Sequence, residues 1–583
     1  MTLRRLVFLS VVVGVVSGLG AFGLYLLIEL CTKFFLTGLG GFSPPNAGGE
    51  LEIARQEIRI LDLPIWLIPA IGGIISGIIV YTFAPEAEGH GTDAVIRSFH
   101  KLRGIIRTRV PIVKMITSAV TIGSGGSAGR EGPIAQIGAG FGSALASLFK
   151  LPDRDRRILV VCGVAGGIGS IFRSPFGGAI FAVEVLYKRD YEVEAIIPAF
   201  ISSVTAYVIF IALMKFSTGT LMTFHIFITP EVKVHSFLEM PIYLILGVLS
   251  AFFGILYIKS FYTTHNLFKR LNIPNHVKPA IGGLLAGVIG FFIPQALGMG
   301  YGYVQKVIDG DLVIDAIILA IFGKILATSF TIGSGGSGGV FGPSVVIGSF
   351  VGGAVGYIFH ELFPDIVIQP EGYILVGMAS FIAGACKTPI AAILMTVEMT
   401  GGYELLPALM LSATVSYLLT GDNTIYIEQV PTRAESPAHR SEMLVDLLEE
   451  IKVKDAMVPA EKVVTVSPDD TVLDVLKLIE RTGYIGYPVV ENGKLVGVIT
   501  FEDVEKVPIE DRAKTKVRDV MTTDLIVAYP DEDLRSALAK IVNHNIGRLL
   551  VVPRDDNTKL LGIITKGDII KAYAKIRAKL ISS

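Results

Sequence analysis

The sequence predicts two parts, an all-α polytopic membrane domain followed by a soluble α/β domain. Of its 583 residues, 51% are hydrophobic and only 18% are charged, which is less charge than a soluble protein of this length carries. Apolar segments continue to about residue 421 and then stop. Several are shorter than the roughly 20 residues that span a bilayer, and glycine or proline interrupts them. Broken helices surround protein-lined cavities, because backbone exposed to lipid is too costly.

The first apolar stretch begins directly after Arg4 and Arg5 and is too long for the core of a signal peptide. We therefore expect a first membrane helix here, and the two arginines favour a cytoplasmic N-terminus. The predicted parts are a membrane domain over 1–430, a polar linker over 431–450, and two soluble copies over 451–508 and 515–577. This organisation predicts a multi-pass cell membrane protein in contact with lipid, with the soluble copies cytoplasmic.

Composition and motifs exclude several classes of function. The formal net charge of −1 indicates no nucleic-acid partner. Cys31, Cys162 and Cys386 are far apart in apolar runs, so we expect reduced thiols. The sequence contains no HExxH or Walker A motif, and we therefore expect neither an enzyme nor a metal site nor a required cofactor.

The membrane half contains an internal repeat. The stretch "KMITSAVTIGSGGSAGREGPIAQIG" at 114–138 recurs as "KILATSFTIGSGGSGGVFGPSVVIG" at 324–348. Further along, "PFGGAIFAVE" at 175–184 matches "PIAAILMTVE" at 389–398. Duplicated halves with interrupted helices are typical of transporters and channels whose site lies between the repeats. The residues alone leave open whether the halves are inverted or parallel.

Both repeats carry a glycine-rich loop that opens a helix, with Pro133 and Pro343 suited to the first helical turn. Backbone N–H groups at a helix N-terminus attract anions. Close packing of helices through small residues is the alternative explanation for such glycines. Two copies with the same spacing favour an anion site.

The two loops differ at one place, where Arg130 and Glu131 align with Val340 and Phe341. A local ion pair between the two neighbours is the simpler interpretation. An ionisable residue inside a membrane segment nonetheless indicates a functional site. A carboxylate can occupy an anion's position and leave it when protonated, so we expect Glu131 to act as a gate.

These motifs resemble the CLC chloride channels and transporters, through "GREGP" at 129–133, "GGVFGP" at 338–343 and the tyrosine of "GDNTIYIEQV", Tyr426. The resemblance implies inverted halves, a homodimer, and one pathway for chloride or a similar anion in each subunit. By position, Glu131 matches the gating glutamate, and the amides of Val340 and Phe341 with the hydroxyl of Tyr426 match the central anion site. The residues that support the motifs are Gly129, Arg130, Gly132, Pro133, Gly339 and Pro343.

Two positions depart from the pattern of that family. The anion-binding motif usually reads GSGIP, and "GHGTD" here puts His90 at the serine position. His90 is thus a candidate anion ligand, and a loop histidine facing water is the alternative. At the position of the cytoplasmic proton-relay glutamate stands Val185, directly after Glu184. Valine carries no proton, so this substitution favours channel-like conduction, with water or Glu184 as a substitute relay otherwise.

The soluble copies resemble a tandem CBS pair, each ending in the signature "GVITFED" (497–503) or "GIITKGD" (562–568). The resemblance implies that ATP, ADP or AMP binds near Thr565 and Asp568, and in second place near Thr500 and Asp503. A carboxylate there can bind ribose hydroxyls, and the threonine can reach phosphate or ribose oxygens. The alternative is a pair that only packs against itself and its dimer mate.

The favoured function is therefore anion transport through a glutamate-gated CLC pathway, as voltage- or pH-gated channel-like conduction that the CBS domains regulate. The alternative is H⁺/Cl⁻ exchange with a non-standard proton relay. A remote alternative is a CBS-regulated cation channel, which needs clustered acidic ligands that the membrane segments lack. Pro133 and Tyr426 follow the chloride-type pattern and disfavour the fluoride-specific branch.

Overall fold

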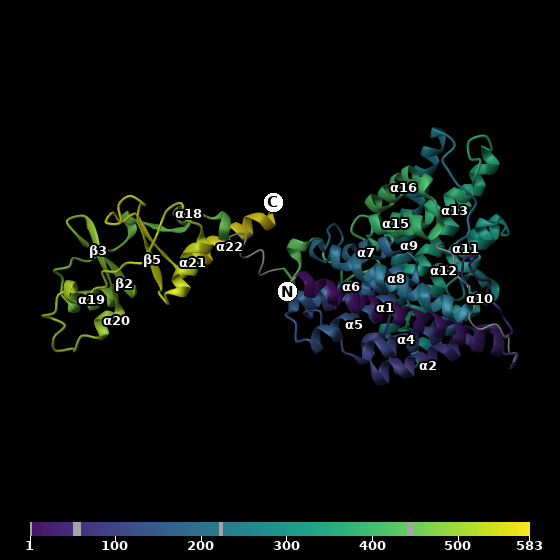
Figure 1. Ribbon diagram of the computed structural model, residues 1–583, viewed down its shortest axis with the longest axis horizontal. Helices are drawn as coiled ribbons and strands as arrows, with labels where there is room; N and C mark the ends of the chain where they lie inside the picture. The colour runs from purple at the N-terminus through teal and green to yellow at the C-terminus, as the bar shows by residue number, and fades with distance from the viewer. Residues whose placement is uncertain (1–2, 51–59, 221–224, 440–447, 583) are drawn as a thin grey trace. The chain divides into compact units, whose positions relative to one another are not determined.

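The computed structural model describes residues 3–50, 60–220, 225–439 and 448–582. Contacts divide the chain into two compact units, Met1–Ala438 and His439–Ser583. The first unit is helical, and the second contains both helices and strands (Figure 1). The first unit ends within the stretch 431–450 that the sequence marks as a linker, and residues 440–447 of that stretch lie outside the described residues.

The first unit is a bundle of helices of very unequal length. Their bounds are α1 (Leu3–Thr32), α2 (Ile68–Phe83), α3 (Thr92–Lys101), α4 (Arg109–Gly123), α5 (Glu131–Leu148), α6 (Asp153–Ile171), α7 (Pro175–Glu184), α8 (Ile196–Thr218), α9 (Met240–Arg270), α10 (Lys278–Phe292), α11 (Tyr301–Ile308), α12 (Ile314–Gly333), α13 (Phe341–Leu362), α14 (Glu371–Cys386), α15 (Pro389–Thr400) and α16 (Leu406–Leu419). Six helical stretches among the described residues are long and apolar enough to cross a membrane. Shorter apolar helices such as α7 and α15 confirm the predicted interruptions.

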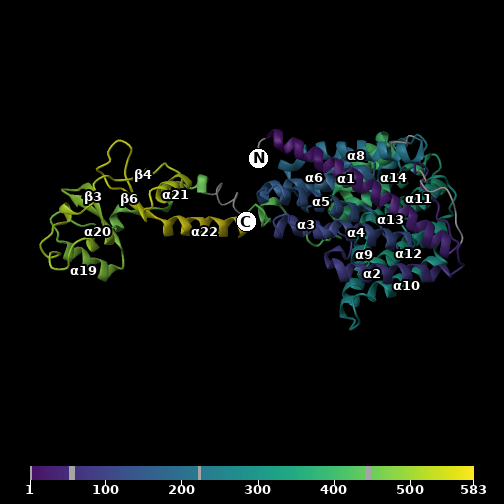
Figure 2. The ribbon, with the colours of Figure 1, turned by 60° about the horizontal axis from the view of Figure 1, so that its bottom comes forward.

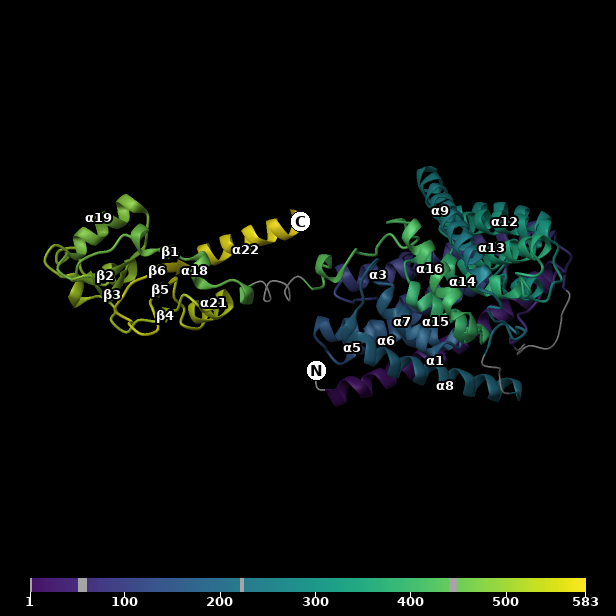
Figure 3. The same ribbon diagram turned by 90° about the horizontal axis from the view of Figure 1, so that it is seen from above.

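The helices of this unit form two equivalent series, in which each helix of the first series corresponds to the helix whose number is eight higher. α5 packs on α6 as α13 packs on α14, and α1 packs on α8 as α9 packs on α16. Figure 3 shows the two members of one such equivalent pair, α7 and α15, side by side. The structure thus confirms an all-α membrane domain built from two copies of one helical arrangement.

Glycines bring the helices of each copy unusually close. A Cβ atom added to Gly138 on α5 would lie 2.0 Å from the carbonyl oxygen of Gly163 on α6, and the reverse distance is also 2.0 Å. Equivalent contacts join Gly348 on α13 to Gly377 on α14, at 2.5 and 2.3 Å. Only a residue without a side chain fits such positions. Glycines within the helices thus allow close packing, and the glycines of the two loops are a separate group, for which the sequence suggests anion binding.

The second unit contains two α/β copies of similar design. Its elements are α18 (Val453–Ala456), β1 (Val458–Pro459), α19 (Val472–Thr482), β2 (Gly486–Glu491), β3 (Lys494–Thr500), α20 (Phe501–Glu505), β4 (Val527–Ala528), α21 (Leu534–Asn543), β5 (Arg548–Val551), β6 (Gly562–Thr565) and α22 (Lys566–Ser582). Figure 2 shows α22 as the long helix that ends this unit.

The two copies of the second unit exchange their first strands. β1 of the first copy pairs antiparallel with β6 of the second, which also pairs antiparallel with β5. In the same way Thr522, at the start of the second copy, bridges Val498 on β3, which pairs antiparallel with β2. Each copy therefore completes the sheet of the other, and the pair folds as one module.

Candidate anion pathway

Two glycine-rich loops meet at the centre of the first unit, where α5 and α13 begin. Gly129 and Gly339 form an antiparallel bridge in which each amide donates to the other residue's carbonyl oxygen, at 2.8 and 2.6 Å. Such reciprocal bonds are expected where a pseudo-two-fold axis passes between inverted repeats. Gly125 and Gly335 hold the loops in left-handed turns, with φ of 93° and 101°. Both helix N-termini consequently lie buried inside the protein.

Glu131 is the first residue of α5, and it is 1% exposed. One carboxylate oxygen accepts a hydrogen bond from the hydroxyl of Tyr301. The other accepts one from the backbone N–H of Gly342, in the first turn of α13, at 3.0 Å. The first N–H groups of a helix have no partner within the helix and carry partial positive charge. The carboxylate of one repeat thus sits at the anion-attracting end of the other repeat's helix.

The residues assigned to the central anion site lie at the same helix end or in its surroundings. Val340 immediately precedes α13 and Phe341 is its first residue, and both are 1% exposed. The carbonyl oxygen of Val340 accepts a hydrogen bond from the hydroxyl of Tyr257 at 3.2 Å. Tyr426 is fully buried, and its hydroxyl has no hydrogen-bond partner among the described residues. A buried donor that no protein group satisfies is chemically suited to an anion.

His90 lies in the loop before α3, with 6% of its surface exposed. Its ring centroid is 5.4 Å from that of Tyr426, and its carbonyl oxygen would be 2.0 Å from a Cβ placed on Gly132. Its Nε2 atom is 3.2 Å from a carboxylate oxygen of Asp93. The histidine therefore belongs to the surroundings of Tyr426 and of the α5 N-terminus, rather than to an outer loop.

Arg130 turns away from its neighbour Glu131. Its guanidinium is 2.6 Å from a carboxylate oxygen of Glu50 and lies 5.5 Å from the ring centroids of both Tyr25 and Tyr301. The simple neighbour ion pair considered from the sequence is therefore not the contact formed. Arg130 instead stacks on the tyrosine that donates to Glu131, and so contributes to positioning that hydroxyl.

Glu184 caps a helix of the other repeat. Its carboxylate accepts hydrogen bonds from the backbone N–H groups of Ile390 at 3.2 Å and Ala391 at 2.8 Å, in the first turn of α15. The equivalent Glu398 accepts from Phe176 and Gly177 in the first turn of α7, at 3.2 and 2.8 Å. The matching final glutamates of "PFGGAIFAVE" and "PIAAILMTVE" thus stabilise each other's helices. Val185, the next residue, is 2% exposed.

Tyr301 contacts Glu131 in the structure, and it is not among the site residues predicted from the sequence. It occupies the position of Thr92 in a further repeated stretch, in which "PEAEGHGT" (85–92) parallels "PQALGMGY" (294–301). Lys114 and Lys324 hold these stretches alike, donating to the carbonyl oxygens of Gly89 at 2.6 Å and Gly298 at 2.7 Å. The proline, the alanine and the two glycines that these stretches share could have shown the repeat, and with it the position of Tyr301, from the sequence.

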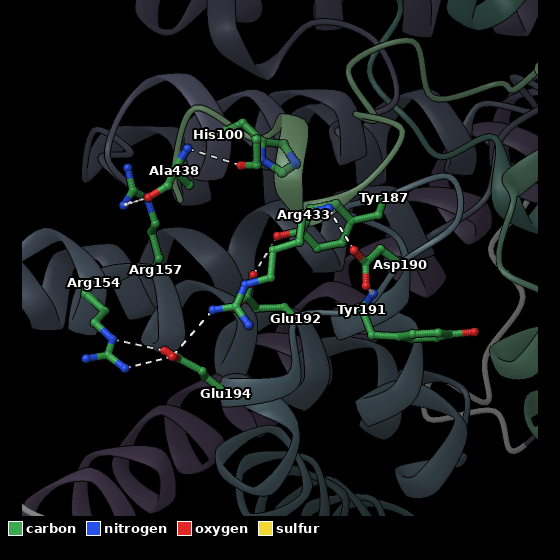
Figure 4. A network of polar contacts seen from close by, with 11 residues as sticks. His100, Arg154, Arg157, Tyr187, Asp190, Tyr191, Glu192, Glu194, Arg433 and Ala438 are labelled. Atoms are coloured by element: carbon green, nitrogen blue, oxygen red, sulfur yellow. Dashed lines mark hydrogen bonds and ion pairs between the residues drawn. The ribbon is translucent and has the colours of Figure 1, made fainter. Parts of the chain in front are cut away.

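The segment that carries Tyr426 is anchored to the loop after α7. Figure 4 shows Arg433 reaching toward Glu192 and Glu194, and the ion-pair distance to Glu194 is 3.4 Å. The backbone N–H of Arg433 also donates to Asp190 at 2.8 Å. Glu194 pairs with Arg154 as well, at 2.7 Å. Ion pairs and backbone contacts thereby fix the chain between the central tyrosine and the end of the first unit.

In the second unit, the proposed nucleotide residues form local helix caps. The Asp568 carboxylate accepts hydrogen bonds from the N–H and the hydroxyl of Thr565 at 3.0 and 2.6 Å, before α22. Asp503 and Thr500 make the same contacts before α20, at 3.0 and 2.8 Å. In both copies the threonine and aspartate of the signature therefore stabilise the start of the following helix, independently of any ligand.

Comparison with known proteins agrees with this architecture. A family model described as voltage gated chloride channel matches residues 72–421, and the CBS domain model matches 453–510 and 517–575. The uncharacterized protein MJ0305 of Methanocaldococcus jannaschii is 33% identical over 392 residues, covering 67% of this chain and 92% of that protein. The H(+)/Cl(-) exchange transporter ClcA of Vibrio vulnificus is 30% identical over 432 residues, covering 72% and 88%.

Solved structures show the same fold. A eukaryotic CLC transporter aligns over 97% of this chain and 98% of its own, with a TM-score of 0.56 at 21% identity. A slow cyanobacterial Cl⁻/H⁺ antiporter aligns over 73% and 97%, with a TM-score of 0.60 at 23% identity.

Fold and sequence similarity together define a membrane protein that transports anions between two inverted repeats, and not an enzyme. The chain belongs to the CLC family, and a tandem CBS module follows its membrane domain.

Proposed function

We propose that the protein exchanges chloride for protons across the membrane, with Glu131 as the group that takes part in both movements. Val185 by itself favoured channel-like conduction. The Vibrio relatives named as exchange transporters, at 28–30% identity, favour the exchange alternative. The contact of the Glu131 carboxylate with the α13 N-terminus is the observation that supports it most, because it places a titratable group on an anion-attracting helix end.

The exchange follows from competition at that helix end. Ionised Glu131 accepts the N–H of Gly342 and the hydroxyl of Tyr301 and thereby excludes an anion. Protonation removes its charge and with it most of its attraction to the helix end, so chloride replaces the carboxylate there. The protonated side chain then carries its proton away from the site. Anion entry and proton binding thus occur together, as coupled exchange requires.

The test is proton movement driven by chloride alone. Purified protein is reconstituted into liposomes with a chloride gradient, the voltage is clamped, and the internal pH is followed with a dye. Exchange predicts proton transport against its gradient in fixed ratio to chloride. Chloride flux without net proton movement would establish a channel and overturn the proposal.

Chloride is held, in this account, by the amides of Val340 and Phe341 and by the hydroxyl of Tyr426. Tyr426→Phe removes only the hydroxyl, so it should weaken chloride binding by about 1.5–3 kcal/mol, the usual value of a hydrogen bond to a charged group. Calorimetric titration measures the affinity. Tyr417→Phe is the matched control, because the Tyr417 hydroxyl donates to a backbone carbonyl of Lys188 instead. Equal chloride affinities for wild type and Tyr426→Phe would show that the Tyr426 hydroxyl does not bind chloride.

We further infer a homodimer whose N-terminus and CBS module are cytoplasmic. Arg4 and Arg5 precede the first membrane helix, as expected for a cytoplasmic end. Protease added to intact cells should leave the CBS module uncut, whereas lysed cells should release it. Multi-angle light scattering in detergent should give twice the mass of the chain.

The CBS module is proposed to bind an adenine nucleotide beside Thr565 and Asp568, and beside Thr500 and Asp503 in second place. Asp568→Ala should weaken nucleotide binding at least about tenfold, a change worth roughly 1.4 kcal/mol. Because Asp568 also caps α22, the thermal unfolding midpoint is measured in parallel. Asp533→Ala removes the N-cap side chain of α21, which accepts the N–H of Ser536, and serves as the control for the loss of a helix cap in the same module. An unchanged nucleotide affinity in Asp568→Ala would contradict this site and favour a module that only packs against itself and its dimer mate.

A further inference from the structure

Coupled exchange needs a group that brings protons to Glu131 from the cytoplasmic side of the membrane. Val185 cannot ionise. Glu184 has both carboxylate oxygens engaged, with the N–H groups of Ile390 and Ala391 and with the hydroxyl of Tyr191 at 3.3 Å. Removing the Glu184 charge would also unsettle the N-terminus of α15. Glu184 thus has a capping role of its own, and a second titratable side chain near the pathway is a separate candidate for the relay.

A cavity of about 790 Å³ leads to the pathway along α3. Its lining includes His90, Asp93, Arg97, Lys101 and His265. Arg97 and Lys101 pair with Glu428 at 2.9 and 2.7 Å, two residues beyond Tyr426 on the segment that continues to the CBS module. The cavity thus opens near the segment from which the CBS module follows, which the proposed function makes cytoplasmic.

His90 lies at the inner end of this cavity, against Tyr426. Its Nε2 atom lies 3.2 Å from a carboxylate oxygen of Asp93, an ion-pair distance. Nδ1 is buried and has no hydrogen-bond partner among the described residues. A buried histidine with one nitrogen oriented by a carboxylate and the other unsatisfied is built to accept a proton.

The other charged groups around His90 are mostly paired with one another. Arg107 pairs with Glu86, Arg103 lies 3.7 Å from Asp153, and Lys114 donates to the carbonyl oxygen of Gly89. Around His90 there remain Asp93 on its own segment, Glu88 before it, Tyr262 and His265 on α9, and Tyr426 beyond α16. Glu131 begins α5, and a Cβ added to the next residue, Gly132, would lie 2.0 Å from the carbonyl oxygen of His90. Asp93 is the acidic group in ion-pair contact with the ring.

On the basis of the proposed exchange, we propose that His90, positioned by Asp93, relays protons between the cavity and Glu131. A hydronium ion in the cavity gives its proton to Nδ1, so that an O–H bond breaks, water remains, and an N–H bond forms on the imidazolium. That bond then breaks, and the proton passes through pathway water to a carboxylate oxygen of Glu131. No electrons are transferred, and the neutral ring is restored. His90 thus takes the place of the glutamate that Val185 replaces.

The test compares His90→Gln with His265→Gln, the same change on another histidine of the same cavity. Proton and chloride fluxes are measured on reconstituted full-length protein. His90→Gln should lower the proton flux at least about tenfold relative to chloride, the scale of losing one proton-transfer group, and His265→Gln should keep the wild-type ratio. Asp93→Asn should lower the proton flux relative to chloride, and Asp93→Glu, which keeps a carboxylate beside the ring, should restore much of it. A purely structural Asp93 would change both fluxes together and leave their ratio unchanged.

The outcomes separate this inference from the proposed function. Absence of proton transport in the wild type would overturn the exchange itself. A coupled wild type whose ratio survives in His90→Gln, or an Asp93→Asn protein that keeps the wild-type ratio, would overturn the relay alone. Should His90→Gln fail to fold, His90→Asn and the flux ratios of Asp93→Asn and Asp93→Glu decide the question.

Discussion

Glu131→Gln should abolish proton transport and leave anion flux that no longer depends on pH. Glutamine keeps the shape of the protonated acid, and it carries neither a charge nor a transferable proton. The α13 N-terminus then loses its competing carboxylate, and the anion binds there at every pH. Proton flux measured with a pH dye should fall to the level of protein-free liposomes, whereas chloride efflux continues.

The matched control for this prediction is Glu361→Gln, an exposed glutamate near the other end of α13. It should keep both the proton flux and the pH dependence. A Glu131→Gln protein that still moves protons, or whose chloride flux keeps the wild-type pH profile, would contradict the role of Glu131 as gate. Glu131→Ala should behave like Glu131→Gln, with the pathway open.

Gly163→Ala should remove most of the folded protein. The added methyl would meet the carbonyl oxygen of Gly138 at 2.0 Å, and backbone on both sides prevents relief by a rotamer change. Overpacking in a well-packed core costs about 1–3 kcal/mol, occasionally more, and this contact joins the two helices that hold Glu131. The yield of monodisperse protein after detergent extraction, and its thermal unfolding midpoint, measure the effect.

Gly23→Ala on α1 is the control for Gly163→Ala. Its added methyl would lie 3.6 Å from the sulfur of Met115, an ordinary van der Waals distance. Alanine is favoured over glycine inside a helix, so this variant should be at least as stable as the wild type. Equal yields for the two variants would show that α5 and α6 separate more easily than their glycine contact indicates.

Much of the fold was predictable from the sequence because duplication leaves a direct signal. The repeated loops, the interrupted apolar segments and the change of composition after residue 421 predict two helical halves and a soluble module. Glu131, Val340 and Phe341 follow from aligning the two loops, since the structure places them at the helix N-termini that the glycines indicate.

What the sequence left undetermined depends on contacts between the halves. Tyr301 donates to Glu131 across 170 positions, and Arg130 finds Glu50 rather than its neighbour. Glu184 stands next to Val185 in the sequence, and only the position of α15 shows that its carboxylate also caps that helix. Likewise β1 pairs with the second CBS copy rather than with its own. Such partners are set by tertiary packing and leave no local pattern.

The central claim is that the Glu131 carboxylate occupies an anion position at the start of α13. Anomalous diffraction from crystals soaked in bromide tests it most directly. In Glu131→Gln crystals the account predicts bromide beside the N–H of Gly342, where the wild-type carboxylate lies, in addition to bromide near Tyr426. The wild type above the pKa of Glu131 should show only the bromide near Tyr426. Bromide beside Gly342 in the wild type with the carboxylate still in place, or none there in Glu131→Gln, would contradict the claim.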